Sequence, residues 1–220
     1  MIRAVFFDLD GTLYDRDSVM RNLLEEQFGV FRESLGGVSE SQFVQRILEV
    51  DAHGQGDNPL LYESVVLEWG LGRELAGHLV RYFRDHYDRH CSLSDDASAT
   101  LQTLRTCGRK LGVITNGGIE WQQQTLRSLG LASFFDTVLI SGSEGLRKPD
   151  PRIFARALER CGVCPGEALF VGDHPEIDVA GAQAAGLIAV WKRVPYWEMA
   201  VENALTVDQL SEILPWCLNR

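Results

Sequence analysis

The sequence is poor in the residues that mark several large classes of protein. It has only 7 prolines in 220 residues and no biased tract, which excludes collagen-like, low-complexity and disordered proteins. Its 5 cysteines are an odd number without regular spacing, so they do not indicate a disulfide framework. The chain has no apolar run long enough to cross a bilayer and opens with no signal-like segment, so we expect a cytoplasmic protein without a membrane partner.

Basic residues are also scarce relative to acidic ones. The 21 lysines and arginines against 31 aspartates and glutamates give a formal net charge of -10, which would repel a phosphate backbone over most of the surface. We therefore expect no nucleic-acid polymer as a partner. A small anionic substrate is compatible with this charge if a metal ion or a cluster of donors reverses the field inside one cleft.

The order of apolar patterns along the chain indicates a parallel sheet with an insertion. Residues 2–8 form a short apolar run that is typical of a buried parallel strand. Residues 17–90 show helical spacing only, with a capping box at Ser39 and Gln42. Helix and strand patterns then alternate. The expected later strands are 110–115, 137–141, 168–172 and 187–191, and the expected later helices are 95–106 capped by Asp95 and Asp96, 119–129, 151–161 opened by Asp150 and Pro151, 177–185 and 208–214.

This order predicts an α/β protein with a Rossmann-like core of three layers, α/β/α, and an inserted α-helical domain. The core is expected to comprise residues 1–15 and 92–220, and the helical domain residues 16–91. The insertion follows the carboxyl end of the first strand, where open α/β sheets bind their ligands. We therefore expect the helical domain to act as a lid.

Two carboxylates follow the first predicted strand. Asp8 and Asp10 lie two residues apart, so their side chains point the same way from an extended chain. Carboxylates this close need a cation between them or a raised pKa, and hard oxygen ligands favour magnesium. Gly11 permits a tight turn there, and Thr12 offers a hydroxyl.

The ends of three later strands carry further polar residues. The segment from Thr115 to Gly117 offers a hydroxyl and backbone N–H groups at a helix start, which suits a phosphate. Lys148 is kept out of a helix by Pro149. Acidic residues follow the strand 168–172. The polar residues at these ends are Thr115, Asn116, Gly117, Lys148, Asp173 and Asp178.

In order and spacing, these residues resemble the four signature motifs of the haloacid dehalogenase superfamily. The motifs are Asp8-Leu9-Asp10-Gly11-Thr12, Thr115-Asn116-Gly117, Lys148-Pro149 and Gly172-Asp173 with Asp178. The helical insertion is similar to the first class of cap domain in that superfamily.

The resemblance implies a role for each motif residue. Asp8 would be the nucleophile that becomes an aspartyl phosphate, and Asp10 would be the general acid and then the general base. Mg²⁺ would be held by the Asp8 carboxylate, the backbone carbonyl of Asp10 and the Asp173 carboxylate. The expected phosphate-binding residues are Thr115, Asn116 through its backbone, and Lys148, with Thr12, Gly117 and Asp178 in support.

The resemblance thus implies a magnesium-dependent phosphatase of small phosphorylated metabolites, acting as a monomer or small homo-oligomer. A phosphomutase or phosphotransferase on the same intermediate is an alternative. A haloacid dehalogenase is a further one, although Asp10 argues against it because that reaction does without the second aspartate. A non-catalytic receiver module also combines acidic pairs, threonine and lysine, but it needs no lid.

Other residues give weaker signals for sites. Cys161 and Cys164 form a single C-x-x-C pair, whereas a structural zinc site needs about four ligands, so we expect small packing residues at a helix end. The histidines at 78, 86 and 90 are expected on a solvated helix face. Substrate selection is expected from the helical domain and from residues 13–17. Candidate contacts are His53, Tyr62, Trp69, Trp121 and His174, whereas Trp191, Trp197 and Trp216 are expected to be packing residues.

Overall fold

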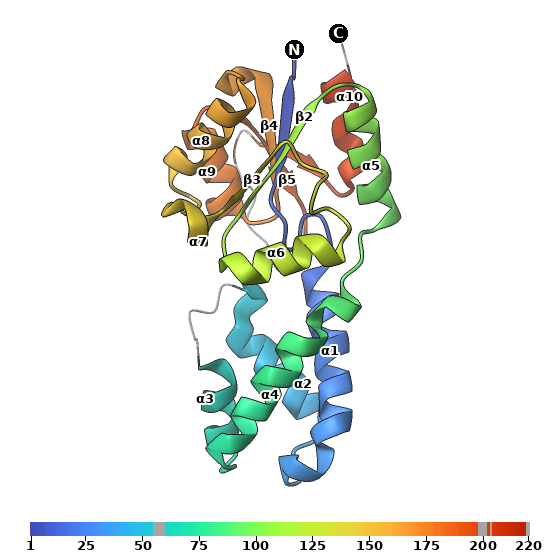
Figure 1. The fold of residues 1–220 in the computed structure, drawn as a ribbon, viewed down its shortest axis with the longest axis vertical. Coiled ribbons are helices and arrows are strands. Elements are labelled where there is room, and N and C mark those ends of the chain that lie inside the picture. Colours follow the sequence, from blue (N-terminus) through green and yellow to red (C-terminus); the bar gives the residue numbers. More distant parts are fainter. Residues whose placement is uncertain (55–59, 198–201, 203, 219–220) are drawn as a thin grey trace. The chain divides into compact units, whose positions relative to one another are not determined.

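The computed structural model describes residues 1–54, 60–197, 202 and 204–218 of the chain (Figure 1). Its backbone contacts divide the chain into two compact units. The α/β unit comprises residues 1–14 and 92–220, and the helical unit comprises residues 15–91.

The α/β unit is built on a six-stranded sheet in which every neighbouring pair of strands is parallel. The strand order is β3-β2-β1-β4-β5-β6, so β1 lies between β2 and β4. This sheet confirms the predicted fold class. The strands are β1 (Ala4–Phe7), β2 (Lys110–Thr115), β3 (Thr137–Ile140), β4 (Ala168–Gly172), β5 (Ile188–Lys192) and β6 (Leu205–Val207).

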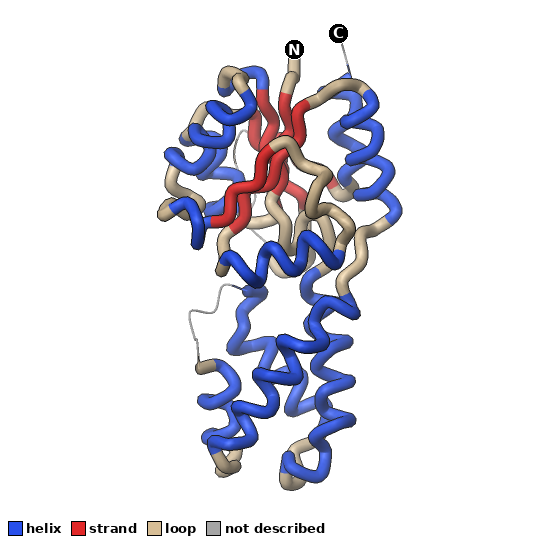
Figure 2. The backbone as a smooth tube through the Cα atoms, in the orientation of Figure 1, coloured by secondary structure: helices blue, strands red, loops and turns tan. Residues whose placement is uncertain are grey.

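Helices cover both faces of this sheet. Figure 1 shows α8 and α9 on one side of the strands and α5 and α10 on the other, and Figure 2 shows the strands between these two helical layers. The described helices of the unit are α5 (Asp95–Thr106), α6 (Ile119–Ser128), α7 (Ser141–Glu144), α8 (Pro151–Cys161), α9 (Gly181–Ala184) and α10 (Leu214–Leu218).

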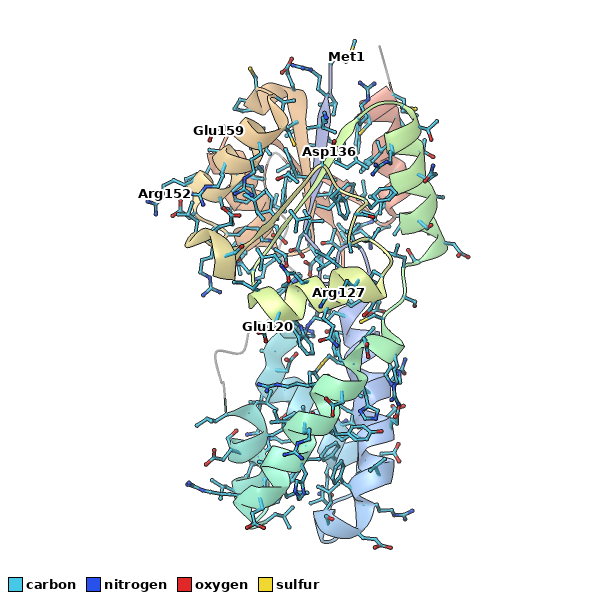
Figure 3. The ribbon with its side chains drawn as sticks, viewed as in Figure 1. Met1, Glu120, Arg127, Asp136, Arg152 and Glu159 are labelled. Carbon is cyan, nitrogen blue, oxygen red and sulfur yellow. The ribbon has the colours of Figure 1, made fainter. Side chains whose placement is uncertain are left out.

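Successive side chains along each strand point to opposite faces of the sheet. Phe6 and Phe170 point to the α8 side, where the Phe170 ring packs against Phe154 at a centroid distance of 5.0 Å. Helix α8 begins at Pro151 with Asp150 as its N-cap, as predicted, and buries one apolar face against the sheet. Its charged residues Arg152 and Glu159 point away from the unit (Figure 3).

The structure differs from the predicted elements near the C-terminus. Strand β6 is not indicated by the sequence pattern, because it has three residues and only Val207 is buried. The predicted helix 208–214 is instead a short 3₁₀ helix, Leu210–Ile213, followed by α10. The predicted helix 177–185 begins earlier, with a π-helical turn over Pro175–Ala180 before α9.

The capping of α5 also differs from the prediction. Ser94 is the N-cap, because its hydroxyl accepts a hydrogen bond from the Ala97 N–H at 3.1 Å. The Asp96 carboxylate instead accepts from Leu210 N–H at 2.7 Å and from Ser211 N–H at 3.2 Å. Asp96 therefore caps the C-terminal 3₁₀ helix across the unit, a contact that no local pattern reveals.

The described part of the helical unit contains four α-helices and has its own buried apolar residues, including Leu23, Phe43 and Leu79. The predicted capping box at Ser39 and Gln42 is confirmed. No helix among the described residues is both long enough and apolar enough to span a membrane. The helices are α1 (Arg16–Phe31), α2 (Glu40–Asp51), α3 (Leu61–Glu68) and α4 (Arg73–His86).

Candidate active site

Three neighbouring strands bring their carboxyl ends together at one edge of the sheet. Asp8 follows β1, Thr115 ends β2 and Asp173 follows β4. The Asp8 N–H donates to the Val171 carbonyl at 2.9 Å, which extends the β1–β4 pairing to the residue that carries the carboxylate. The sequence places polar side chains here because buried parallel strands leave only their ends open to ligands.

Two glycines allow the backbone to approach these carboxylates closely. Gly11 has φ +79°, and a Cβ there would lie 2.8 Å from Asp173 Oδ2. A Cβ at Gly172 would lie 2.4 Å from the Asp178 Cβ. The site therefore excludes larger residues at both positions.

Three carboxylates form the centre of the site. Single ligand oxygens of Asp8, Asp173 and Asp178 lie within 4.8 Å of one another, and all three residues are buried. Burial raises the pKa of Asp8 well above its ordinary value, and Lys148 only partly opposes this. Burial, followed by the Asp178 charge, raises the pKa of Asp173 to about 7.

Lys148 is the positive group of this cluster. Its Nζ lies 2.5 Å from Asp8 Oδ1 and 2.6 Å from Asp178 Oδ1, and the residue is 2% exposed. Burial alone lowers the pKa of Lys148, but the Asp178 and Asp8 carboxylates outweigh it and raise the pKa above its ordinary value. The Asn116 side chain binds the Lys148 backbone at both its N–H and its carbonyl, at 2.9 and 3.0 Å, and so fixes the loop.

The donor set fits a hard divalent cation. All three ligand groups are carboxylates, and a cation would relieve the burial cost that raises the pKa of Asp8 and of Asp173. Asp178 is already engaged, because Oδ1 accepts from Lys148 and Oδ2 accepts from the His174 N–H at 3.1 Å. This geometry favours Asp8 and Asp173 as direct ligands and Asp178 as a residue that supports them.

Two threonine hydroxyls are buried in the motifs beside the carboxylates. Thr12 Oγ1 and Thr115 Oγ1 have no hydrogen-bond partner among the described residues. Buried hydroxyls are normally paired, so these two are suited to an anion such as phosphate. Gly117 differs from its expectation, because its N–H donates to Ser141 Oγ at 3.0 Å and is not free for a ligand.

Asp10 lies in a different environment from Asp8. The Tyr14 hydroxyl donates to Asp10 Oδ1, and Gln122 Nε2 donates to Asp10 Oδ2 at 2.8 Å. Sequence reasoning missed both partners. Tyr14 could have been found from the sequence, because it lies only four residues after Asp10 and a turn at Gly11 can bring the two side chains together. Gln122 could not, because it is 112 residues from Asp10 along the chain.

Aromatic residues surround Asp173, and this corrects the sequence-based interpretation of two tryptophans. Trp191 Nε1 donates to the Asp173 backbone carbonyl at 2.8 Å, and Trp197 Nε1 donates to Asp173 Oδ2 at 3.3 Å. The Tyr196 hydroxyl also donates to Oδ2, at 3.3 Å. Trp191 and Trp197 are therefore not packing residues alone, because Trp191 lies near the carboxyl end of β5 and the chain after β5 brings Trp197 to the same edge of the sheet.

The candidate residues of the helical unit are engaged within that unit. His53 Nδ1 lies 2.5 Å from Asp17 Oδ2, and Tyr62 is buried with its hydroxyl bound to a glutamine. Trp69 packs against Phe43 at a ring distance of 6.0 Å. The later histidines are also partnered there. His86 stacks on Tyr82, and His90 Nε2 lies 2.8 Å from Glu26 Oε2.

Comparisons with known proteins all point to the same family. A family model described as haloacid dehalogenase-like hydrolase matches residues 2–186. The glyceraldehyde 3-phosphate phosphatase of Methanopyrus kandleri is 33% identical over 210 residues, covering 92% of this chain and 89% of that protein. A phosphatase structure from Thermococcus onnurineus has a TM-score of 0.70 and 28% identity over 98% of this chain and 97% of that one. A 2-haloacid dehalogenase structure from Pseudomonas syringae has a TM-score of 0.65 and 29% identity over 99% and 98% of the two chains.

Proposed function

The chain belongs to the haloacid dehalogenase-like hydrolases, and from this membership we propose that it is a magnesium-dependent phosphatase that hydrolyses small phosphomonoester metabolites through an aspartyl phosphate. One observation carries the proposal. Asp8 and Asp10 are two residues apart but lie in separate environments. Asp8 contacts Lys148 and the other carboxylates, whereas the Asp10 carboxylate accepts hydrogen bonds from two neutral donors, Tyr14 and Gln122. Two carboxylates in different environments are suited to two different roles.

The proposed roles follow from these contacts. An Asp8 carboxylate oxygen attacks phosphorus, and the bond from phosphorus to the leaving oxygen breaks while Asp10 protonates that oxygen. Water then attacks the phosphorus of the aspartyl phosphate, Asp10 takes a proton from this water, and the Asp8 carboxylate is restored with release of inorganic phosphate. Lys148 neutralises charge on the phosphoryl oxygens, and the Thr12 and Thr115 hydroxyls donate to them.

Magnesium would supply positive charge for the phosphoryl oxygens and for Asp8. The residues that would hold it are Asp8 and Asp173 through their carboxylates and Asp10 through its backbone carbonyl. Asp178 would keep Lys148 and the loop at His174 in place. Within this enzyme, we assign the catalytic core to residues 1–15 and 92–220 and substrate selection to the helical residues 16–91.

Asp10 also separates this proposal from halide displacement. Displacement of halide at carbon produces a leaving group that needs no proton, so a second, carefully held carboxylate has no task in the first step. The Pseudomonas relative shows that dehalogenases share this fold. The contacts of Asp10 favour a phosphatase reaction such as that of the Methanopyrus relative, a glyceraldehyde 3-phosphate phosphatase.

The test is phosphate release from a panel of phosphorylated metabolites with and without Mg²⁺. The panel contains glyceraldehyde 3-phosphate, other sugar phosphates, phosphoglycolate and nucleoside monophosphates. We expect release from the wild type only with metal, and a loss of roughly 10⁴-fold or more in Asp8→Asn. Asp85→Asn, an exposed aspartate of α4, makes the same chemical change outside the site and is the matched control.

Other outcomes would each contradict part of the proposal. Recovery of the phosphoryl group on a second alcohol instead of in water would indicate a phosphotransferase or mutase. Halide release from a 2-haloacid would indicate a dehalogenase. A stable phosphate on Asp8 with no turnover would indicate a receiver-like module.

A further inference from the structure

Both carboxylate oxygens of Asp10 are held by side chains whose roles the proposed chemistry has not yet used. The Tyr14 hydroxyl donates to Oδ1 and Gln122 Nε2 donates to Oδ2 at 2.8 Å. Each of the two donors is only 3% exposed. They come from different parts of the α/β unit, since Tyr14 follows β1 and Gln122 belongs to α6.

Backbone geometry delivers Tyr14 to this position. The Leu13 N–H donates to the Leu9 carbonyl at 3.0 Å, and the Gly11 N–H donates to the Tyr14 carbonyl at 3.1 Å. The chain therefore turns back immediately after Asp10. The turn depends on the positive φ of Gly11, and it places the phenol of Tyr14 against the carboxylate four residues before it.

The orientation of the Gln122 amide is determined by its neighbours. Besides Asp10, Nε2 donates to the Asn116 backbone carbonyl at 3.0 Å. Both partners can only accept, so the nitrogen must face them and the oxygen must point elsewhere. Gln122 thereby connects Asp10 with the loop that binds the Lys148 backbone through Asn116.

Gln122 is a poor choice for packing alone. Its Oε1 is buried and has no hydrogen-bond partner among the described residues. A buried amide oxygen without a partner is destabilising, and leucine or methionine would fill the same helical position without that cost. The contact with Asp10 accounts for an amide at this position.

We propose that Gln122 and Tyr14 are positioning residues that hold the Asp10 carboxylate in place for its two proton transfers. This inference rests on the proposed phosphatase function. Without the two donors, the Asp10 side chain rotates away, and fewer molecules have a carboxylate within reach of the leaving oxygen. Small misplacements of a catalytic group are costly, with losses of about 10²-fold for displacements near 1 Å.

The experiment compares two aryl phosphates that differ in their need for a proton. Phenyl phosphate has a poor leaving group that needs protonation, whereas the leaving group of p-nitrophenyl phosphate departs without it. For Gln122→Leu and Tyr14→Phe, we expect kcat/KM to fall about 10- to 100-fold with phenyl phosphate and less than about 3-fold with p-nitrophenyl phosphate. With p-nitrophenyl phosphate, kcat should fall because breakdown of the aspartyl phosphate slows, giving a burst of nitrophenolate.

Gln123→Leu is the matched control. Gln123 is the next residue of α6 and is exposed, so the substitution makes the same chemical change on the outer face of the helix. We expect both substrates to react at wild-type rates in this variant. Equal losses for the two substrates in Gln122→Leu and Tyr14→Phe, or no loss in either, would overturn the positioning role, because damaged packing does not distinguish leaving groups.

A crystal structure of each variant provides a readout that does not need activity. We expect the Asp10 side chain to leave its present position in Gln122→Leu and in Tyr14→Phe, and an unchanged side chain in both would overturn the proposal. Failure of the phosphatase proposal would instead be seen in the wild type, as absence of metal-dependent hydrolysis. If Gln122→Leu does not fold, Tyr14→Phe removes a single oxygen atom and carries both tests.

Discussion

Each unit of the protein contains a buried glutamine, and the two glutamines are used differently. In the helical unit, Gln27 Nε2 donates to the Leu79 carbonyl and Gln27 Oε1 accepts from the Tyr62 hydroxyl, both at 2.8 Å. In the α/β unit, Gln122 Nε2 has two acceptors, whereas its Oε1 has no partner among the described residues. Gln27 therefore joins three helices, while Gln122 leaves an unpaired oxygen beside a catalytic motif.

The same contrast holds for the other polar groups that the structure describes. No buried side-chain nitrogen or oxygen in the described part of the helical unit lacks a partner. At the carboxyl edge of the sheet, Thr12 and Thr115 have unpaired hydroxyls, and burial raises the pKa of Asp8 and of Asp173. Thr100 Oγ1 and Arg109 Nε of the α/β unit are also buried without a partner among the described residues, so an unpaired atom alone does not indicate a ligand. The combination of unpaired hydroxyls with carboxylates of raised pKa at one edge of the sheet indicates the place where a ligand binds.

Among the variants that test this difference between the two units, Asp10→Asn is expected to have the largest effect on the reaction rate. An amide occupies the same space as the carboxylate but cannot exchange the proton that both steps need. We expect each half-reaction to slow by about 10²- to 10⁴-fold. Single-turnover experiments that follow formation and then hydrolysis of the aspartyl phosphate measure the two steps separately.

The fold should tolerate Asp10→Asn at a moderate cost. The Tyr14 hydroxyl can still donate to the amide oxygen, but the amide nitrogen then faces Gln122 Nε2, which is also a donor, so we expect the free energy of unfolding to fall by about 1 to 3 kcal/mol. Denaturant unfolding of the variant is the control. If only one half-reaction slows, Asp10 serves only that step and the assignment of both proton transfers to it is wrong.

Asp173→Asn tests the cost of the buried carboxylates. Burial raises the pKa of Asp173 from its ordinary 3.8 to about 7, so the metal-free fold binds this proton more tightly than the unfolded chain does. The stability contributed by the protonated group is complete at pH below about 4 and is lost as the pH rises to about 7. In EDTA, the free energy of unfolding of the variant should therefore exceed that of the wild type by an amount that grows from pH 5 to pH 8. We expect this growth to be on the order of 2 kcal/mol, because one pKa unit corresponds to about 1.4 kcal/mol.

Magnesium should reverse this difference, since the wild type gains stability from the metal and the variant loses a ligand for it. Urea unfolding at pH 5 and pH 8, with EDTA or Mg²⁺, measures all four cases. Asp95→Asn, on the exposed surface of α5, is the control and should show neither trend. A pH-independent difference between the wild type and Asp173→Asn would show that this carboxylate carries no burial cost.

The fold was largely predictable because its signals are local. Buried strands such as β1 and β4 are short apolar runs. Helix α8 begins at an Asp-Pro pair, in which the aspartate is the N-cap and the proline is the first helical residue. Strand β6 was not predictable, because it has only three residues, of which only Val207 is buried, and so shows no periodic pattern. The N-cap of α5 was predicted wrongly at Asp95 and Asp96 and lies at Ser94, because the Asp96 carboxylate contacts the distant C-terminal 3₁₀ helix instead.

The site was predictable only to the extent that its residues stand at strand ends. Asp8, Thr115 and Asp173 follow predicted strands, so parallel order alone brings them to one edge. Gln122 and Trp197 reach the same edge through the packing of α6 and of the chain after β5. Their positions depend on tertiary structure, and an isolated glutamine or tryptophan in a helix or loop gives no sign of it.

The smallest effect on catalysis is expected from Tyr62→Phe, which leaves Gln27 Oε1 buried without its donor and so imitates the unpaired oxygen of Gln122. We expect a loss of about 1 to 3 kcal/mol in the free energy of unfolding, with kcat/KM unchanged, because Tyr62 is a buried packing residue of the helical unit. Tyr82→Phe removes the same atom where the side chain of its partner Glu26 is 38% exposed, and it should cost less than about 0.5 kcal/mol because water replaces the donor. Denaturant unfolding and kinetics on the same samples test both statements. A drop of tenfold or more in kcat/KM for Tyr62→Phe would show that Tyr62 contributes to substrate recognition, and the helical unit would then also contain a buried polar pair that serves a ligand.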